Sequence, residues 1–374
     1  MFPRRIALLL TTASSFVFVA GQVQQLPSTK RLGHPAKPAE LVNSMPSAIA
    51  SSPDGRYIAI VHTGYGSTAN GGRQSITLIE IANGSIHEYN EDRLKLRAKQ
   101  TYSFGIAFSA DSSQLYVPFA STSDPLAKAG GTGNGIGVYQ VRRDGLSFER
   151  MIPLPLVELA AGKRPLHLSK AVTGQQQVPF PAGIARFTQQ GREKLVVAEQ
   201  LSDTLAFVDV ASGRLESRID IGQNATVPSA YPYNVVVDES GKHAYVSLWN
   251  ASLVLDVDCA ARQINRRFVL LPPDSPTGAS SHPAALALNE QKGVLYVALA
   301  NRDEVAAVQL ATGNVQYAST ASKTVPFAGL YPSGIALDAA RHTLFVSNAS
   351  QNSVALLDVS GETPRYRGAF PRGS

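Results

Sequence analysis

PSGIALDAARHTLFVSNASQNSVALLDV, residues Pro332–Val359, contains the pattern that decides the fold. A proline opens a short run of small and apolar residues, a polar turn follows, and two more runs rich in β-branched and aromatic residues end near Asp358. Such runs are typical of β-strands, and the polar stretches between them have the composition of tight turns. The stretch therefore predicts three consecutive strands joined by turns.

The same pattern occurs six times, and a more variable fourth run follows each copy. The copies begin at Pro46, Ser103, Pro181, Pro232, Pro283 and Pro332, the last four about fifty residues apart. Four strands per repeat predict the blades of a β-propeller, whereas a sandwich or jelly roll has no such period. Glycine or alanine near the start of each first strand suits the crowded centre of a propeller. We therefore predict an all-β propeller of four-stranded blades with six repeats visible.

Composition supports a folded, strand-rich chain. Of 374 residues, 44% are hydrophobic and only 17% are charged, which is enough apolar content for a packed core and excludes general disorder. A single cysteine, Cys259, excludes an intrachain disulfide framework and any zinc or iron–sulfur site built from cysteines. The formal net charge of +6 is a mild excess for this length.

The N-terminus has the pattern of a secretory signal peptide. Arg4 and Arg5 precede an apolar run, Ile6–Ala20, and small residues then give a cleavage point before Gln22. The run is too short to span a bilayer comfortably as an anchor. We predict a signal peptide at 1–21, a linker at 22–37, the propeller at 38–370 and a tail at 371–374. The expected location is the periplasm or the cell exterior.

The repeated motifs resemble a known family. Pro-x-Gly-Ile-Ala, Asp-Gly, Leu-Tyr-Val and Val-x-x-Val-Asp at these offsets resemble YVTN-type propeller repeat proteins, which are secreted or surface-associated and seven-bladed. The resemblance covers about residues 38 to 370. Tyr231-Pro232-Tyr233, His282-Pro283 and Tyr331-Pro332 also resemble the propeller part of secreted bacterial propeller–phosphoesterase proteins. The resemblance implies the fold and the cellular location. It leaves the activity open because the matching positions are strand and turn residues.

The blade number has two readings. Ala39–Asn43 lies where an outermost strand would and could complete a final blade whose other three strands come from the C-terminus. Either six repeats close a ring with a loose N-terminal strand, or a seven-bladed propeller has been cut short. The family resemblance favours a seven-bladed parent. A cut ring would expose two sheet faces that normally pack together.

Long loops gather on one predicted face. The connections after second strands, such as Phe119–Asn134, and those between blades, such as Asp144–Val178, hold nearly every insertion, which favours a binding surface there. Aromatic and amide side chains at this face suit polar ligands, sugars or peptide segments. The candidate ligand-binding residues are Tyr102, Gln200, Tyr231, Tyr233, Trp249, Asn250, His282, Asn301, Arg302, Tyr331 and Asn348.

Enzymatic motifs are missing from the sequence. It has no His-Glu-x-x-His zinc motif and no Gly-x-Ser-x-Gly nucleophile elbow, and its seven histidines lie far apart. We therefore predict no catalytic residue, no metal ligand and no cofactor. The basic run from Arg93 to Lys99 lacks interleaved aromatic residues, so nucleic-acid binding is not expected.

Three functions remain open. The leading one is an extracytoplasmic scaffold that binds a protein or a small polar ligand through the loop-rich face, as the N-terminal module of a phosphoesterase-like protein or alone. The second is a lactonase-like hydrolase, which needs acidic and Asn metal ligands in the channel. The third is a surface-layer or adhesion protein. For this chain alone the sequence leans away from an enzyme.

Overall fold

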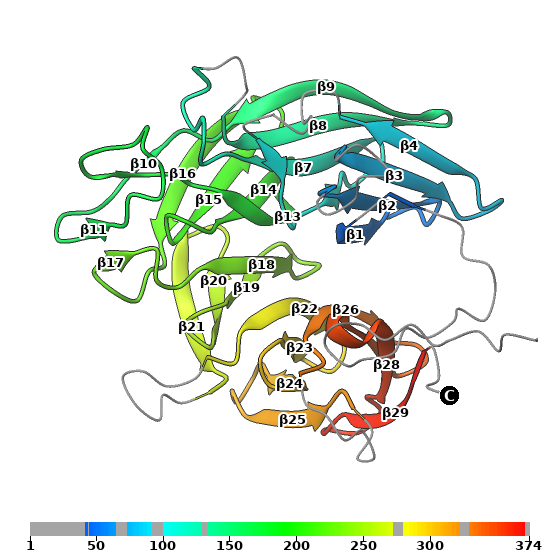
Figure 1. The fold of residues 1–374 in the computed structure, drawn as a ribbon. Helices are drawn as coiled ribbons and strands as arrows, with labels where there is room; N and C mark the ends of the chain where they lie inside the picture. Colours follow the sequence, from blue (N-terminus) through cyan, green and yellow to red (C-terminus); the bar gives the residue numbers. More distant parts are fainter. Residues whose placement is uncertain are drawn as a thin grey trace, which may run out of the picture.

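The computed structural model describes residues 42–370 apart from 44, 65–72, 92–99, 129–132, 272–279 and 322–328. Most of its described strands form six sheets that follow one another around a central axis (Figure 1), and the remaining ones form two small two-stranded sheets. The predicted all-β propeller with six four-stranded blades is therefore confirmed. The predicted signal peptide, linker and tail, and most of Ala39–Asn43, lie outside the described residues.

Each blade is an antiparallel sheet whose strands run in chain order from the axis outward. Blade 1 contains β1 (Pro46–Ser51), β2 (Tyr57–His62), β3 (Ser75–Glu80) and β4 (Ile86–Asn90). Blade 2 contains β5 (Thr101–Tyr102), β6 (Ala107–Phe108), β7 (Gln114–Ala120), β8 (Gly135–Arg142) and β9 (Gly145–Pro153). Blade 3 contains β13 (Pro181–Gln189), β14 (Arg192–Glu199), β15 (Thr204–Asp209) and β16 (Arg214–Asp220).

The second half of the chain repeats this arrangement. Blade 4 contains β18 (Pro232–Val237), β19 (His243–Leu248), β20 (Leu253–Asp258) and β21 (Gln263–Val269). Blade 5 contains β22 (Pro283–Asn289), β23 (Val294–Leu299), β24 (Glu304–Gln309) and β25 (Val315–Ser319). Blade 6 contains β26 (Pro332–Asp338), β27 (Thr343–Asn348), β28 (Ser353–Asp358) and β29 (Arg365–Phe370), with the short 3-10 helix η1 (Ala349–Gln351) between β27 and β28.

Two sequence expectations need correction. The segment 144–178, expected to be a connection between blades, begins with β9, the outermost strand of blade 2. The rest of it carries β10 (Val157–Glu158), β11 (Arg164–Pro165) and β12 (Gln176–Gln177). Of these, β10 pairs with β12, while β11 pairs with β17 (Thr226–Val227) from the next connection. The inner strand expected from Ser103 is broken into β5 and β6, both of which pair with β7.

The core is divided into five apolar clusters, one between each pair of consecutive blades. Alternation of side chains along each strand sends one set toward the preceding blade and the other toward the next, so both faces of a middle blade are buried. Glycines let the inner strands approach closely. A Cβ atom on Gly105 would lie 2.1 Å from the carbonyl oxygen of Ala182, and one on Gly183 would lie 2.5 Å from that of Tyr233. The crowded centre predicted from the sequence is therefore present.

Blade 6 and blade 1 differ from the other neighbours in the ring. The extensive packing between consecutive blades is not repeated between the described strands of blade 6 and those of blade 1. In Figure 1 the strands of blade 1 lie at the upper right and those of blade 6 at the lower right.

Candidate functional site

Five aromatic side chains lie close together at one end of the propeller axis. We call Phe104, Tyr233, Trp249, His282 and Tyr331 the aromatic cluster. The Trp249 ring is its centre, with ring centroids 4.7 Å from His282, 5.0 Å from Tyr233 and 6.2 Å from Tyr331. Phe104 stacks on Tyr233, with ring centroids 5.4 Å apart. These spacings are those of favourable aromatic pairs. The cluster therefore joins blades 2, 4, 5 and 6 across the axis.

An unusual backbone conformation places several of these side chains. Tyr231, His282 and Tyr331 each precede the proline that opens an inner strand, and each has a left-handed φ between 47° and 57°. A residue with a Cβ atom in this region costs roughly 1 kcal/mol or more, so the surroundings must hold it there. The carbonyl of each accepts a backbone N–H from the turn after the second strand of its blade. For Tyr231 this donor is Trp249, at 3.0 Å.

Two aspartates, each in the blade before the tyrosine it contacts, hold the backbone of Tyr231 and Tyr331 in place. The buried carboxylate of Asp203 accepts backbone N–H groups from Ser229 at 2.6 Å and from Tyr231 at 3.0 Å, as well as two longer contacts from the residue between them. Asp303 Oδ1 likewise accepts the backbone N–H of Tyr331, at 3.2 Å. Each aspartate belongs to one blade and binds the chain as it enters the next, so the position of both tyrosines depends on blade-to-blade packing.

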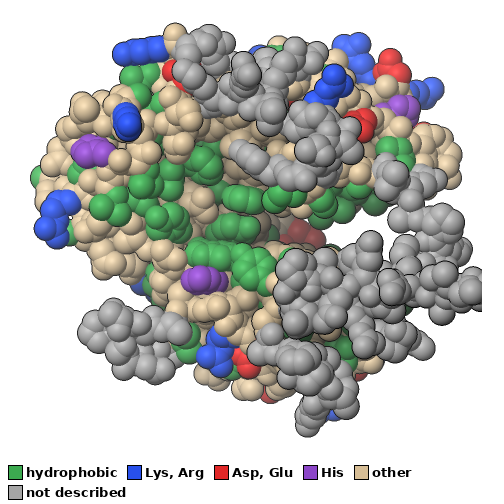
Figure 2. Space-filling model, in the orientation of Figure 1, with side chains coloured by type: hydrophobic (Ala, Val, Ile, Leu, Met, Phe, Trp, Pro, Cys, Tyr) green, Lys and Arg blue, Asp and Glu red, His purple; other side chains and the backbone are tan. Residues whose placement is uncertain are grey.

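A cavity of about 880 Å³ opens beside the aromatic cluster. Figure 2 shows hydrophobic side chains gathered around a hollow in the middle of this face. The lining includes the rings of Phe104, Tyr231, Tyr233, Trp249 and Tyr331. Gln200 and Asn250 also line it, as do Ile49 and Ile60 of blade 1. The described lining contains no acidic, basic or histidine side chain.

The titratable groups around the cavity are neutral near pH 7. Burial, with a smaller contribution from the nearby Tyr331 hydroxyl, raises the pKa of Tyr233 to about 12. Burial also raises the pKa values of Tyr231 and Tyr331. Desolvation lowers the pKa of His282 below its ordinary value, so the imidazole stacked on Trp249 is uncharged. The site therefore offers aromatic faces and neutral hydrogen-bonding groups.

The structure brings together most of the residues predicted to bind ligand. Gln200, Tyr231, Tyr233, Trp249, Asn250 and Tyr331 line the cavity, and His282 packs on Trp249 behind it. Whether any of them binds a ligand stays a prediction.

Asn301 and Arg302 follow the second strand of blade 5 but do not line this cavity. The Asn301 amide donates to the carbonyl of Ser280 at 3.0 Å, and the Arg302 guanidinium pairs with Glu304 at 2.8 Å. Their side chains are therefore engaged in contacts within the loops.

Tyr102 and Asn348 are buried and do not line this cavity, so a ligand-binding role for them stays a prediction. Tyr102 does not adopt the left-handed conformation of Tyr231; it pairs within β5, and its hydroxyl lies 2.9 Å from that of Tyr139 in the core between blades 1 and 2. The Asn348 amide donates to the carbonyl of Thr320 at 3.1 Å. Sequence position alone did not distinguish these inward-facing side chains.

Phe104 is a cavity residue that the sequence analysis missed. It occupies the same place in blade 2 as Tyr233 does in blade 4, directly after the residue that opens the first strand. Comparing the repeats position by position would have found it.

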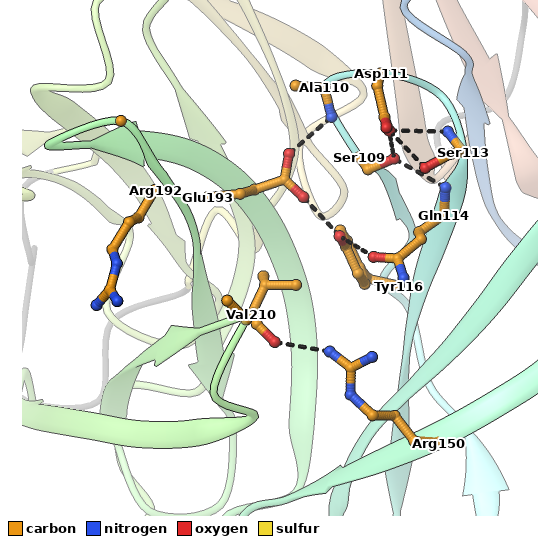
Figure 3. Close-up of a pocket in the computed structure, with 12 residues that line it drawn as sticks. Ser109, Ala110, Asp111, Ser113, Gln114, Tyr116, Arg150, Arg192, Glu193 and Val210 are labelled. Carbon is orange, nitrogen blue, oxygen red and sulfur yellow. Dashed lines mark hydrogen bonds between the residues drawn. The ribbon is translucent and has the colours of Figure 1, made fainter.

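A second cavity, of about 540 Å³, lies between strand-connecting turns of blades 2 and 3 (Figure 3). Its polar side chains bridge the two blades. Glu193 accepts the Tyr116 hydroxyl at 2.5 Å and the backbone N–H of Ala110 at 2.7 Å, and Arg150 donates to the carbonyl of Val210 at 2.7 Å. Because these groups bind one another, we interpret this cavity as part of the blade interface.

Two absences concern only the described part of the chain. There, no three His, Cys, Asp or Glu side chains are grouped so that they could hold a metal ion. Within the same residues, no helix has the length and apolar character needed to cross a membrane. The basic run from Arg93 to Lys99 lies outside the described residues.

The fold is shared with many solved propellers. The periplasmic gluconolactonase of Pseudomonas aeruginosa is similar with a TM-score of 0.59 at 17% identity, over 88% of this chain and 86% of that one. A putative 6-phosphogluconolactonase from Bacteroides fragilis has a TM-score of 0.56 at 13% identity, over 89% and 85%. Hydrazine synthase of Kuenenia stuttgartiensis has a TM-score of 0.58 at 14% identity, over 87% and 79%.

At these identities the likeness shows the fold alone. No family model matches the sequence, and no curated protein matches it. The resemblance to YVTN-type and phosphoesterase-linked propellers therefore stays a prediction.

Proposed function

We propose that this chain is an extracytoplasmic binding propeller whose cavity takes a neutral ligand with a flat apolar face, such as a sugar ring. The observation that carries the proposal is the aromatic cluster centred on Trp249, which opens onto a cavity that Gln200 and Asn250 also line. Ligand sites commonly combine an apolar aromatic wall with a few polar groups that set orientation.

The chemistry of the lining selects the ligand class. The aromatic faces favour a flat apolar surface, which pyranose rings present on one side. The two amides can both donate to and accept from sugar hydroxyls. A charged ligand would lose its hydration here without meeting a group of opposite charge in the described lining, which is costly.

A lactonase-like hydrolase is the alternative, and two of the similar structures carry lactonase names. A sugar lactone is also neutral and has the size of a sugar ring, so the cavity could bind one. Hydrolysis, however, needs a general base or a metal-bound water at the ligand, and the described lining has no carboxylate or imidazole to supply either. We therefore expect binding of glucono-δ-lactone without faster hydrolysis.

Trp249 is the only tryptophan in the chain, so its fluorescence reports directly on this site. Titration with glucose, cellobiose, chitobiose and glucono-δ-lactone should give a saturable change for at least one of them. Asn250→Ala should weaken that binding about tenfold, the loss of roughly one hydrogen bond. Asn301→Ala is the matched control, since Asn301 is outside the cavity. Absence of saturable binding across the panel, or equal weakening by both variants, would contradict the proposal.

Lactone hydrolysis is followed separately with the same protein. Hydrolysis above the background rate that is lost in Asn250→Ala would favour the hydrolase instead.

The predicted cellular location and partners are tested by mass spectrometry and cell fractionation. Mass spectrometry of the native protein should find a mature N-terminus at Gln22, and fractionation should find it in a periplasmic or secreted pool. Recovery with the cell envelope would favour the surface-layer or adhesion function. An intact mass well above that of this sequence would support its role as a module of a phosphoesterase-like protein.

A further inference from the structure

Arg186 is a half-buried cation near the propeller axis. It lies on β13, and the residue opposite it on β14 is Leu195, which is buried in the core between blades 2 and 3. In the part of the chain that the structure describes, the Arg186 guanidinium has no hydrogen bond and no ion pair. Partial removal of a guanidinium from water costs hydration free energy, and here no contact within the described fold offsets that cost.

The other repeats favour an apolar residue at this position. Arg186 is the fifth residue after Pro181, and counting in the same way from the first residue of the other repeats gives Ser51, Phe108, Val237, Leu288 and Leu337. Four of these five residues are apolar. Val237, Leu288 and Leu337 each pack against the core that their blade shares with the preceding one. The fold therefore does not require an arginine at this position.

Arg186 lines a third cavity, of about 500 Å³, which lies among the inner strands of blades 1 to 4. The residues of this cavity come from the later parts of those strands and from the turns that follow them, whereas the aromatic cluster lies where the inner strands begin. The third cavity shares no lining residue with the cavity beside the aromatic cluster. It is therefore a separate site at the opposite end of the propeller axis.

Arg186 is the one basic side chain in the described lining of the third cavity. Asp238 and Glu239 also line it. The Asp238 carboxylate is engaged in its own turn, where it accepts the backbone N–H groups of Lys242 at 2.8 Å and of His243 at 3.0 Å. Glu239 is exposed to water in the same turn. The guanidinium of Arg186 is therefore available to a ligand.

We infer that the third cavity binds a small organic carboxylate, which the Arg186 guanidinium holds while apolar walls surround the rest of the ligand. The planar guanidinium can donate two parallel N–H bonds to the two oxygens of a carboxylate. One cation balances the single charge of a carboxylate, whereas a phosphate dianion would keep an unmatched charge beside apolar walls. The apolar side chains of the lining include those of Phe108, Ile184, Val235 and Val237. The inference does not depend on what the cavity beside the aromatic cluster binds.

Calorimetric titration of the full chain tests the binding. The probes are benzoate, phenylacetate and hexanoate, each beside its neutral amide, and inorganic phosphate. At least one carboxylate should bind saturably, and at least about tenfold more tightly than its amide and than phosphate. Absence of saturable carboxylate binding, equal binding of the amide, or tighter binding of phosphate would overturn the inference.

Two arginine variants then locate the site. Arg186→Leu should weaken carboxylate binding at least about tenfold. Arg214→Leu removes the same charge from an exposed position of blade 3 outside this cavity, and it should leave the binding unchanged. Equal weakening by both variants would show attraction to the overall charge of the protein instead of a site at Arg186.

Melting curves separate lost binding from lost folding. Arg186→Leu introduces the residue that blades 5 and 6 have at this position, so it should melt at the same temperature as the parent or higher. A saturating carboxylate should raise the melting temperature of the parent and leave that of Arg186→Leu unchanged. If Arg186→Leu instead melts at a lower temperature, the guanidinium stabilises the fold and the inference fails.

Discussion

Replacing Asp203 should destabilise the protein strongly, although the residue touches no ligand. Its buried carboxylate accepts three consecutive backbone N–H groups, from Ser229 to Tyr231, where the chain enters blade 4. Asp203→Ala removes the acceptor and leaves these donors in the interior. A lost hydrogen bond of this kind costs about 1–3 kcal/mol, and entering water can replace part of it. We expect a loss of about 3–5 kcal/mol of unfolding free energy in total.

The structure also supplies a matched control for this variant. Asp303 makes the equivalent contacts to Gly329, Leu330 and Tyr331, but at a more exposed site where water can take over. Asp303→Ala should therefore cost less, about 1–2 kcal/mol.

Urea unfolding followed by Trp249 fluorescence and by circular dichroism measures both variants. The reasoning would be refuted if Asp203→Ala stayed within about 1 kcal/mol of the parent, or if Asp303→Ala were the more destabilising of the two.

Three further predictions follow from single contacts. Protonation of His282, whose pKa burial lowers, should change Trp249 fluorescence in a titration with a midpoint below pH 6.5, and His282→Gln should abolish that titration. The hydrogen bond to Asp256 is the main cause that raises the pKa of His243. The stabilisation of the fold by this pair is therefore fully present below pH 6.5 and is lost as the pH rises through the raised pKa. Melting curves should show His243→Gln less stable than the parent at pH 5.5, by well under 1 kcal/mol, and equally stable at pH 9. Tyr116→Phe should lower stability by about 1–2 kcal/mol in urea unfolding, because its hydroxyl donates to a carboxylate of the next blade; an unchanged midpoint would contradict the bridging role of that contact.

Several features of the site could be predicted from the repeats. The residues flanking the prolines that open inner strands, such as Tyr233 and His282, meet near the axis because every blade places these positions at the same end of the ring. The position of a residue in the repeat therefore predicts which other side chains lie close to it. This rule does not place Tyr102 correctly. The inner strand of blade 2 is broken there, and the backbone does not turn the Tyr102 side chain toward the axis.

Most strands, their grouping into six blades and their radial order within each blade were predictable from the sequence. These follow from local patterns of apolar alternation and turn residues, which repeat along the chain. The exposure of the faces of the first and last blades depends on long-range packing. Ile49 and Ile184 occupy the same place in nearly identical motifs, yet one is exposed and the other is buried. The reason is that burial of a blade face depends on whether another sheet lies beside it, and no local pattern contains that information.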